Sequence, residues 1–110
     1  MNANVQDSFR ALADPTRRKI LMYLSTQDLT IGEVTEHFDM TRAAVKKHLN
    51  ILESGNLISV RRQGRERINK LEPKGLKSVS EWLNYFDHFW DRRLTDLDNA
   101  IKADKGNNNV

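Results

Sequence analysis

Two strong helix-start signals follow one another closely in the middle of this chain, at Thr30 and Thr41. Thr30 stands three residues before Glu33, and each side chain can accept a hydrogen bond from the backbone amide of the other, which is a capping box. Thr41 is a second residue of the type that caps a helix N-terminus. A short helix over 31–38 must therefore end before a second helix, over 42–54, begins. Two short helices joined by a tight turn are typical of a helix-turn-helix.

A β-hairpin is predicted directly after these two helices. Gly55 is suited to the left-handed position that ends the helix over 42–54. Residues 57–62 and 65–71 are rich in β-prone side chains and flank a Gln-Gly turn. A basic hairpin that follows a helix-turn-helix forms the wing of a winged helix-turn-helix, and we expect the wing to span residues 57–71.

The flanking segments are predicted to be helical. Val5–Leu12 has apolar residues at helical spacing, and Asp14 followed by Pro15 predicts the start of a helix over 16–24. Pro73 can open a long last helix over 74–101, and the Asn-rich residues 102–110 are expected to form a flexible tail. The expected fold is mainly α with a small β-hairpin, in the order helix, helix, helix, helix, hairpin, helix.

Length and composition place this fold in one domain, which we expect to span residues 1–101. The 110 residues suffice for a single compact domain. No apolar run approaches the ~20 residues that a membrane-spanning helix needs, and the N-terminus has no signal-peptide pattern. The chain contains no cysteine, so a disulfide framework and thiolate chemistry are excluded. These features predict a cytoplasmic protein without a membrane partner.

The positive charge of the chain is concentrated in residues 41–70. This stretch carries eight positive and two negative side chains, a net charge of +6, whereas the rest of the chain carries ten positive and thirteen negative side chains. A charged solvated face is one reading of such a stretch. A polyanionic partner is the other, and its position on a helix-turn-helix and wing favours double-stranded DNA.

The helix over 42–54 is predicted to be a recognition helix that enters the major groove of DNA. At 100° per residue its apolar side chains fall on one face and its basic and polar side chains on the other. Arg42 can bond a guanine edge with two donors, and the small Ala43 permits close approach to a thymine methyl. The wing arginines are expected to contact mostly phosphate. The predicted DNA contacts are Thr41, Arg42, Ala43, Lys46, Lys47, Asn50, Arg61, Arg62, Arg65 and Arg67.

The last helix is predicted to mediate a homodimer. Its apolar residues recur at spacings of three and four, and five of the eight aromatic residues of the chain lie in residues 82–90. So small a body cannot bury two apolar stripes of one helix, and a large exposed apolar surface is unusual for a monomer. A packed core helix and a ligand pocket between helices are the alternatives. The expected interface residues are Val5, Phe9, Trp82, Leu83, Tyr85, Phe86, Phe89, Trp90, Leu94 and Leu97.

Catalysis and a metal centre are not expected. The sequence contains no Gly-rich phosphate loop and no Ser/His/Asp constellation, and its three histidines stand in separate predicted elements. Asp87, His88 and Asp91 are neighbours on the last helix, but the three histidines of the chain do not form a cluster, so no metal ligand and no cofactor are predicted. His48 falls on the apolar side of its helix and is expected to be packed or bonded to phosphate.

The sequence resembles the ArsR-type winged-helix repressors over about residues 5–71. The matching stretches are Phe9–Leu21, Met40–Leu49, Leu52–Ile58 and Arg61–Glu66. The resemblance implies a homodimer that represses its own operon and reads an inverted-repeat operator. The founding metal sensors of this family carry cysteines in their third helix, whereas the corresponding Thr30–Phe38 has none. The stretches Glu81–Leu83 and Phe89–Leu94 resemble a metal-independent branch of the family. A metal- or ligand-responsive sensor of the same fold, and a winged helix used only for protein contacts, remain the alternatives.

Overall fold

The computed structural model describes the backbone of residues 5–108 and the side chains of residues 5–103. Contacts within the chain divide it into two units, residues 1–79 and residues 80–110. Residues 1–4 of the predicted domain and residues 109–110 of the predicted tail lie outside the described residues. No helix in the described chain is long and apolar enough to cross a membrane.

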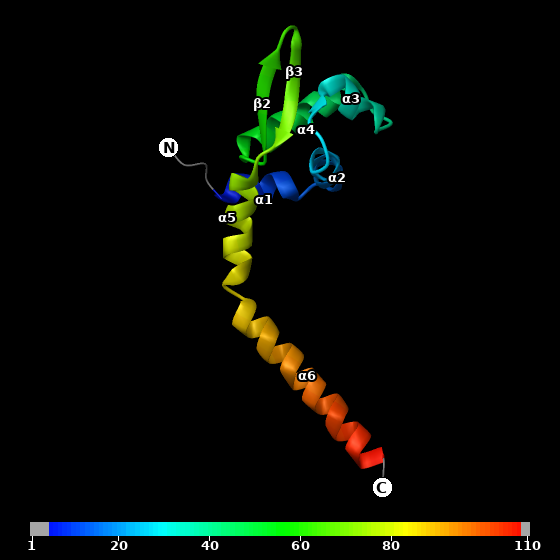
Figure 1. Cartoon of the computed structure of the whole chain (residues 1–110), viewed down its shortest axis with the longest axis vertical. Helices are drawn as coiled ribbons and strands as arrows, with labels where there is room; N and C mark the ends of the chain where they lie inside the picture. Colours follow the sequence, from blue (N-terminus) through cyan, green and yellow to red (C-terminus); the bar gives the residue numbers. More distant parts are fainter. Residues whose placement is uncertain (1–4, 109–110) are drawn as a thin grey trace. The chain divides into compact units, whose positions relative to one another are not determined.

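The first unit contains most of the secondary structure, and its order agrees with the predicted order of elements (Figure 1). It consists of α1 (Val5–Leu12), α2 (Pro15–Leu24), β1 (Leu29–Thr30), α3 (Ile31–Glu36), α4 (Arg42–Ser54), β2 (Ile58–Gln63), β3 (Glu66–Leu71) and the beginning of α5 (Pro73–Asn84). The helix-turn-helix and wing predicted from the sequence are confirmed by α3, α4 and the β2–β3 hairpin. The third helix is shorter than predicted, because it ends at Glu36 rather than at Phe38.

Three side-chain caps place the starts of the helices where the sequence predicts them. The Asp14 carboxylate accepts a hydrogen bond from the Arg17 amide at 3.0 Å, and α2 begins at Pro15. The Thr30–Glu33 capping box is complete, with both hydrogen bonds formed. The Thr41 hydroxyl accepts from the Ala44 amide at 3.1 Å and starts α4. These caps satisfy amides that helix geometry leaves without partners.

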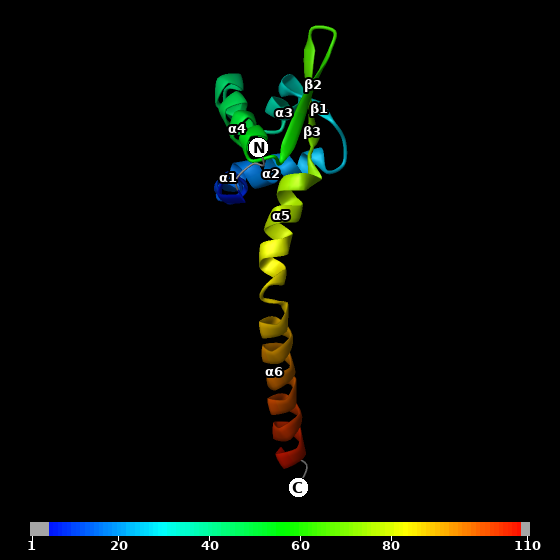
Figure 2. The same cartoon turned by 90° about the vertical axis from the view of Figure 1, so that its left-hand side faces the viewer.

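The sheet has three antiparallel strands in the order β1-β3-β2, so it contains one strand more than the predicted hairpin. The strand β1 lies beside β3 (Figure 2). Leu29 pairs with Asn69 of β3, and Thr30 pairs with Ile68. The buried Asn69 side chain also donates to the Leu29 carbonyl oxygen at 3.1 Å. The strand β1 has only two residues, which is too short for an alternating pattern of apolar and polar side chains, so the sequence does not predict it.

The core of the first unit lies between α2, α3, α4 and the sheet. In α1 the buried residues are Ser8 and Ala11, whereas Val5, at one end of the predicted apolar face, is exposed. The buried apolar side chains are Ala11, Ile20, Leu21, Leu24, Leu29, Val34, Val45, Leu49, Leu52, Leu57 and Ile58.

The end of α4 corrects one prediction about Gly55. The left-handed residue is Asn56, with φ 57°, whereas Gly55 has φ −87°. Gly55 is required for space instead, because a Cβ there would lie 2.8 Å from the Asp7 carbonyl oxygen. A Cβ on Gly75 would lie 2.6 Å from the carbonyl oxygens of both Gly55 and Asn56. The first turn of α5 therefore packs backbone to backbone against the end of α4.

The single helix predicted over 74–101 is wrong, because two helices cover this stretch. The helix α5 ends at Asn84, and α6 runs from Asp87 to Asn108, beyond the predicted start of the tail at residue 102. At the break, the amides of Tyr85 and Phe86 bond carbonyls only three residues back. Asn, aromatic residues and Asp are weaker helix formers than Leu or Ala, which accounts for a break without Pro or Gly.

Candidate nucleic-acid interface

The exposed face of α4 carries every residue that the sequence predicts for the recognition helix. Val45, Leu49 and Leu52 are buried on the core side, as the periodicity predicts. No ion pair among the described residues includes Arg42, Lys46 or Lys47 on the opposite face, so their donors are available to a ligand. The predicted contacts Thr41, Arg42, Ala43, Lys46, Lys47 and Asn50 are all exposed, and so are Ile51, Glu53 and Ser54 at the end of α4.

A groove of about 330 Å³ separates α4 from the wing. It combines two cations of α4, Arg42 and Lys46, with two cations of the wing, Arg65 and Arg67. The carboxylates Glu53 and Glu66 also reach it. The full lining is Thr30, Ile31, Gly32, Arg42, Lys46, Leu49, Asn50, Glu53, Val60, Arg65, Glu66, Arg67 and Asn69. Cations of two elements that are well separated in the sequence thus form one basic surface.

Five predicted contact residues are exposed but do not line this groove: Thr41, Ala43, Lys47, Arg61 and Arg62. Among them Arg61 has an acidic partner, because its Nη2 atom lies 3.7 Å from an Asp28 carboxylate oxygen. Conversely, the sequence did not predict Thr30, Gly32 and Asn69 as groove residues. The signal available in the sequence for Asn69 was a polar amide within a β-prone run, since such a residue needs a hydrogen-bond partner when the strand is buried.

Behind α4, Arg17 connects three elements of the first unit. Its Nε atom donates to the Ala11 carbonyl oxygen at 2.8 Å, and Nη2 donates to the Arg10 carbonyl oxygen at 3.1 Å. Both acceptors lie at the end of α1, where helix geometry leaves carbonyls unpaired. Nη1 lies 3.3 Å from Nδ1 of His48 on α4. The Arg17 guanidinium therefore fixes α4 to the end of α1, a role that the sequence did not reveal.

The half-buried His48 is packed, in agreement with one of its two predicted roles. Arg17 can only donate, so in this contact the Nδ1 atom of His48 is the acceptor. Asp14 lies 4.0 Å from the same nitrogen. The hydrogen bond from the Arg17 amide is the largest cause that lowers the pKa of Asp14 below its ordinary value, and the nearby Arg17 charge contributes further. An ionised Asp14 thus caps α2 beside the recognition helix.

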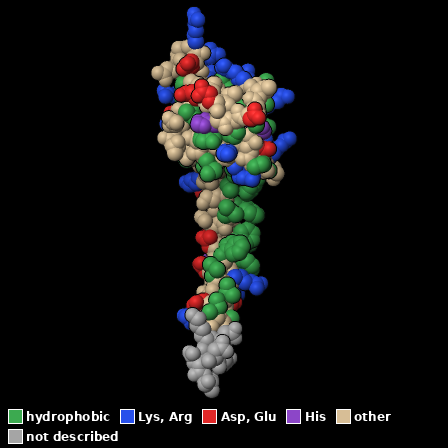
Figure 3. All heavy atoms as spheres, turned by 90° about the vertical axis from the view of Figure 1, so that its right-hand side faces the viewer, with side chains coloured by type: hydrophobic (Ala, Val, Ile, Leu, Met, Phe, Trp, Pro, Cys, Tyr) green, Lys and Arg blue, Asp and Glu red, His purple; other side chains and the backbone are tan. Residues whose placement is uncertain are grey.

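The predicted dimer residues of the second unit form an exposed apolar surface. Phe86 is half-buried, and the exposed fractions of the others range from 48% for Phe89 to 81% for Tyr85. Figure 3 shows hydrophobic side chains gathered along one side of the helices that contain them. The exposed apolar residues of this unit are Trp82, Leu83, Tyr85, Phe89, Trp90, Leu94, Leu97 and Ile101. We call this surface the apolar stripe.

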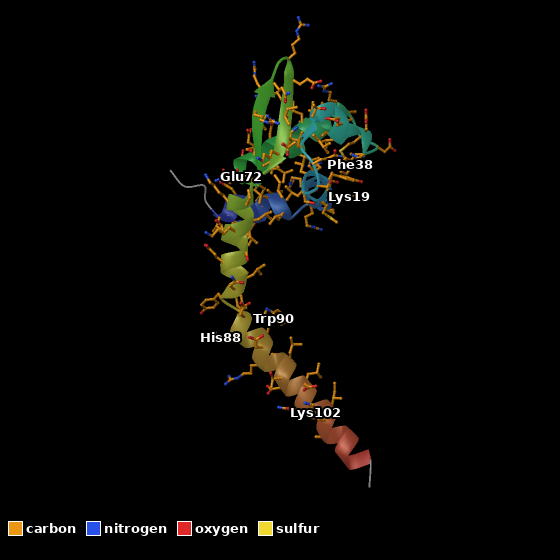
Figure 4. All side chains as sticks on the ribbon, viewed as in Figure 1. Lys19, Phe38, Glu72, His88, Trp90 and Lys102 are labelled. Carbon is orange, nitrogen blue, oxygen red and sulfur yellow. The ribbon has the colours of Figure 1, made fainter. Side chains whose placement is uncertain are left out.

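Aromatic contacts organise the beginning of the apolar stripe. Phe86 makes edge-on contacts with Trp82 and Tyr85, with ring centroids 5.0 and 5.2 Å apart. Phe89 and Trp90 form a further pair at 5.5 Å. Trp90 and His88 lie in the first turn of α6, and Lys102 lies further along it (Figure 4). On α1, Val5 is 37% exposed and Phe9 is half-buried.

No three His, Cys, Asp or Glu side chains within the described residues are placed to hold a metal ion. Asp87, His88 and Asp91, which are neighbours in the sequence of α6, therefore do not form such a group. The chain also contains no cysteine at any position.

Comparison with known proteins identifies the family. The family model described as "Bacterial regulatory protein, arsR family" matches residues 14–60, which include α2, α3 and α4. The transcriptional repressor SdpR of Bacillus subtilis is 37% identical over 78% of this chain and 96% of its own length. The HTH-type transcriptional regulator Rv2034 of Mycobacterium tuberculosis is 35% identical over 88% of both chains.

The solved structures agree with the sequence relatives. The crystal structure of the ArsR family transcriptional regulator RHA00566 matches 78% of this chain and 94% of its own, with 36% identity and a TM-score of 0.72. The fold, the residues matched by the family model and the relatives all correspond to a helix-turn-helix that binds DNA. This family consists of transcriptional regulators and not of enzymes. The chain therefore belongs to the ArsR family of bacterial regulatory proteins and is a DNA-binding transcriptional regulator.

Proposed function

We propose that this regulator is a cytoplasmic homodimeric repressor that binds an inverted-repeat operator upstream of its own gene, without a metal effector. The observation that carries the proposal is the basic groove between α4 and the wing, where Arg42, Lys46, Arg65 and Arg67 meet. In this proposal α4 enters the major groove of DNA and the wing follows the phosphate backbone.

The predicted contacts of α4 divide into base and backbone roles in this proposal. Arg42 stands in the first turn of α4 and is exposed, so its two parallel donors can read a guanine edge. Thr41 and Ala43 flank it at the end of the helix nearest the bases. Lys46, Lys47 and Asn50 lie further along, where phosphate contacts become more favourable.

The apolar stripe supports a homodimer. Side chains such as Trp90, which is 57% exposed, and Leu94, which is 62% exposed, gain a large apolar burial when a second copy covers them. A two-fold partner would repeat each contact, and exposed Val5 and half-buried Phe9 of α1 are the other residues we assign to the interface. Two copies would present two α4 helices to half-sites about one DNA turn, ~34 Å, apart.

The composition supports a metal-independent branch of the family. The chain has no cysteine for a thiolate site, and none of its three histidines lies in a group of three potential ligands within the described residues. Relatives of this chain also include a probable mercury resistance operon repressor of Streptomyces lividans and an arsenical resistance operon repressor of Staphylococcus xylosus. The first of these aligns with about half of this chain.

The test is a fluorescence-anisotropy titration onto a duplex from upstream of the chain's own gene. A scrambled duplex is titrated in parallel, at two salt concentrations and with and without added Zn²⁺. We expect a preference of ~10³ or more for the upstream duplex, a steep loss of affinity with salt, and no effect of zinc. Equal binding to both duplexes contradicts the operator proposal, and a zinc-dependent change contradicts the metal-independent branch.

The matched variants are Arg42→Ala and Lys19→Ala. Arg42→Ala should cost about 1–3 kcal/mol on the upstream duplex and much less on the scrambled one, because a base contact is lost. Lys19 is an exposed cation of α2 outside the groove, so Lys19→Ala controls for the loss of one positive charge. An equal loss on both duplexes would mean that Arg42 contacts phosphate only.

A further inference from the structure

The register of the hairpin places the wing arginines on different faces of the sheet. Residues that stand directly opposite each other in an antiparallel pair have side chains on the same face. Arg62 stands opposite Arg67, and two residues further along Val60 stands opposite Asn69. Since side chains alternate along a strand, these two pairs share one face. Val60, Asn69 and Arg67 line the groove, and Arg62 shares their face of the wing, although the opposite face also contributes Thr30 and Glu66 to the lining.

Arg61 lies on the other face. It stands opposite Ile68, which in turn pairs with Thr30 of β1. Its guanidinium lies 3.7 Å from the Asp28 carboxylate, at the end of the loop that leads into β1. Arg61 therefore has a partner within its own chain and lies on the face of the wing opposite to Arg62 and Arg67.

The pair of Arg62 and Arg67 is unfavourable in the free protein. Like charges directly opposite each other in a sheet repel and destabilise the hairpin. No ion pair among the described residues includes either arginine, although Glu66 is adjacent in sequence and also reaches the groove. An anion placed between the two guanidinium groups removes the repulsion and receives hydrogen bonds from both.

We propose that Arg62 and Arg67 bind one backbone phosphate of DNA together, whereas Arg61 makes no DNA contact and anchors the wing to Asp28. This assignment rests on the proposed binding of DNA in the groove and specifies how the wing takes part in it. The two α-carbons of directly opposite residues lie ~5 Å apart, close enough for both long side chains to reach one phosphate group. The repulsion within the pair lowers the stability of the free wing, and its relief by the phosphate adds to the affinity for DNA.

The experiment compares wild type, Arg62→Ala, Arg67→Ala, the double variant and the control Arg61→Ala. Each is titrated by anisotropy onto the upstream and scrambled duplexes at three or more salt concentrations. Arg62→Ala and Arg67→Ala should each weaken binding to both duplexes alike, by about tenfold, since phosphate contacts carry no sequence information. Arg61→Ala should leave both affinities unchanged. An Arg61→Ala loss as large as that of Arg62→Ala overturns the division of the wing.

The salt dependence distinguishes one shared phosphate from two separate ones. The slope of log affinity against log salt falls by about one for each phosphate contact that is lost. The double variant should therefore reduce the slope by about one relative to wild type, and a reduction by about two overturns the shared site. If wild type binds neither duplex, the proposed function fails and the phosphate assignment fails with it.

Thermal unfolding of the free proteins provides a readout without DNA. Arg62→Ala and Arg67→Ala should each raise the unfolding midpoint slightly, because the cross-strand repulsion is removed, and the double variant should gain less than the sum of both. Arg61→Ala should lower the midpoint or leave it unchanged, because it loses the Asp28 contact. A lower midpoint for Arg62→Ala overturns the proposed repulsion, whatever the DNA titrations show.

Discussion

The two units of this chain use their apolar side chains in opposite ways. In the first unit, large side chains such as Ile20, Leu52 and Leu57 are fully buried, and capped helices and a paired sheet surround them. In the second unit, Trp90, Leu94 and the other residues of the apolar stripe are each about half exposed or more. The first unit therefore gains stability from its own core, whereas the second needs a partner to gain much from its apolar residues. The two regions should respond to different perturbations.

The largest effect is expected for Gly75→Ala in the first unit. The new Cβ would lie 2.6 Å from two backbone carbonyl oxygens, those of Gly55 and Asn56, which cannot move independently of α4. The cost should be about 3 kcal/mol of unfolding free energy, the upper end for overpacking. Urea unfolding followed by circular dichroism measures it.

Gly32→Ala is the matched control for this variant. The nearest atom to a Cβ at Gly32 is 3.9 Å away, and Gly32 is helical, so alanine should leave the stability unchanged or raise it. Equal losses for both variants would show that the contact between α5 and the end of α4 does not constrain the first unit.

A smaller effect, in a different observable, is expected for Trp90→Ala in the second unit. Loss of a large ring from the proposed dimer interface should weaken the dimer by about 2 kcal/mol, or roughly thirtyfold in Kd. Sedimentation equilibrium measures it, and the unfolding free energy of the first unit should change little. Thr95→Ala, exposed on the same helix, is the control. A wild-type protein that sediments at the monomer mass of 12.8 kDa at all concentrations would contradict the proposed homodimer.

A smaller loss of unfolding free energy is expected for Ser8→Ala in the first unit. The buried Ser8 hydroxyl donates to the Gly55 carbonyl oxygen at 2.7 Å, so alanine leaves a buried acceptor without its partner. The loss should be about 1–2 kcal/mol of unfolding free energy. Ser25→Ala removes an exposed hydrogen bond to the Met22 carbonyl and should cost less. Similar losses at both serines would argue against a special role of the buried contact.

The smallest effect is expected from acid. Hydrogen bonds from the Thr30 amide, chiefly, and from the Thr30 hydroxyl lower the pKa of Glu33 below its ordinary value of 4.5. A lowered folded-state pKa means that the stabilisation is complete above pH 4.5 and is lost as the pH falls through the folded value. Asp14 acts in the same direction below its ordinary value of 3.8.

The variant that tests this acid dependence is Glu33→Gln. Its unfolding midpoint should fall less than that of wild type between pH 5 and pH 3, because glutamine does not titrate. Glu36→Gln, exposed at the end of the same helix, should follow the wild-type curve. Identical acid profiles for wild type and Glu33→Gln would show that the capping box contributes no pH dependence.

Local chemistry explains which parts of the fold the sequence predicts well. Asp14, Thr30 and Thr41 cap helices through atoms only three residues away, so the signal lies within a short window of sequence. The apolar period of α4 likewise predicts which of its faces is buried. The exposed cations of α4 follow from the same period, without knowledge of the rest of the chain.

Features that depend on distant contacts were missed. The strand β1 exists because Leu29 and Thr30 pair with β3, about forty residues further along. Gly55 is a glycine because of Asp7, not because of its own φ. The break before α6 was missed for another reason, since the spacing of apolar residues continues through Tyr85 and Phe86 while the backbone does not.

The site was predicted less completely than the fold. The ten predicted contacts are all exposed. The two faces of the wing cannot be told apart from the sequence alone, because they depend on the register of β2 against β3. Arg61 differs from Arg62 by one position and lies on the opposite face. Arg17, counted with the other cations, proves to be a structural donor to α1 and His48.

In the proposed homodimer, the apolar stripe makes the number of chains in the cell a regulatory quantity. When the dimer is the species that grips both half-sites, and most chains are monomers, the dimer concentration rises with the square of the chain concentration. Halving the supply of chains then lowers the dimer about fourfold. Dilution by growth or proteolysis would release the operator sharply, and no small molecule would have to bind.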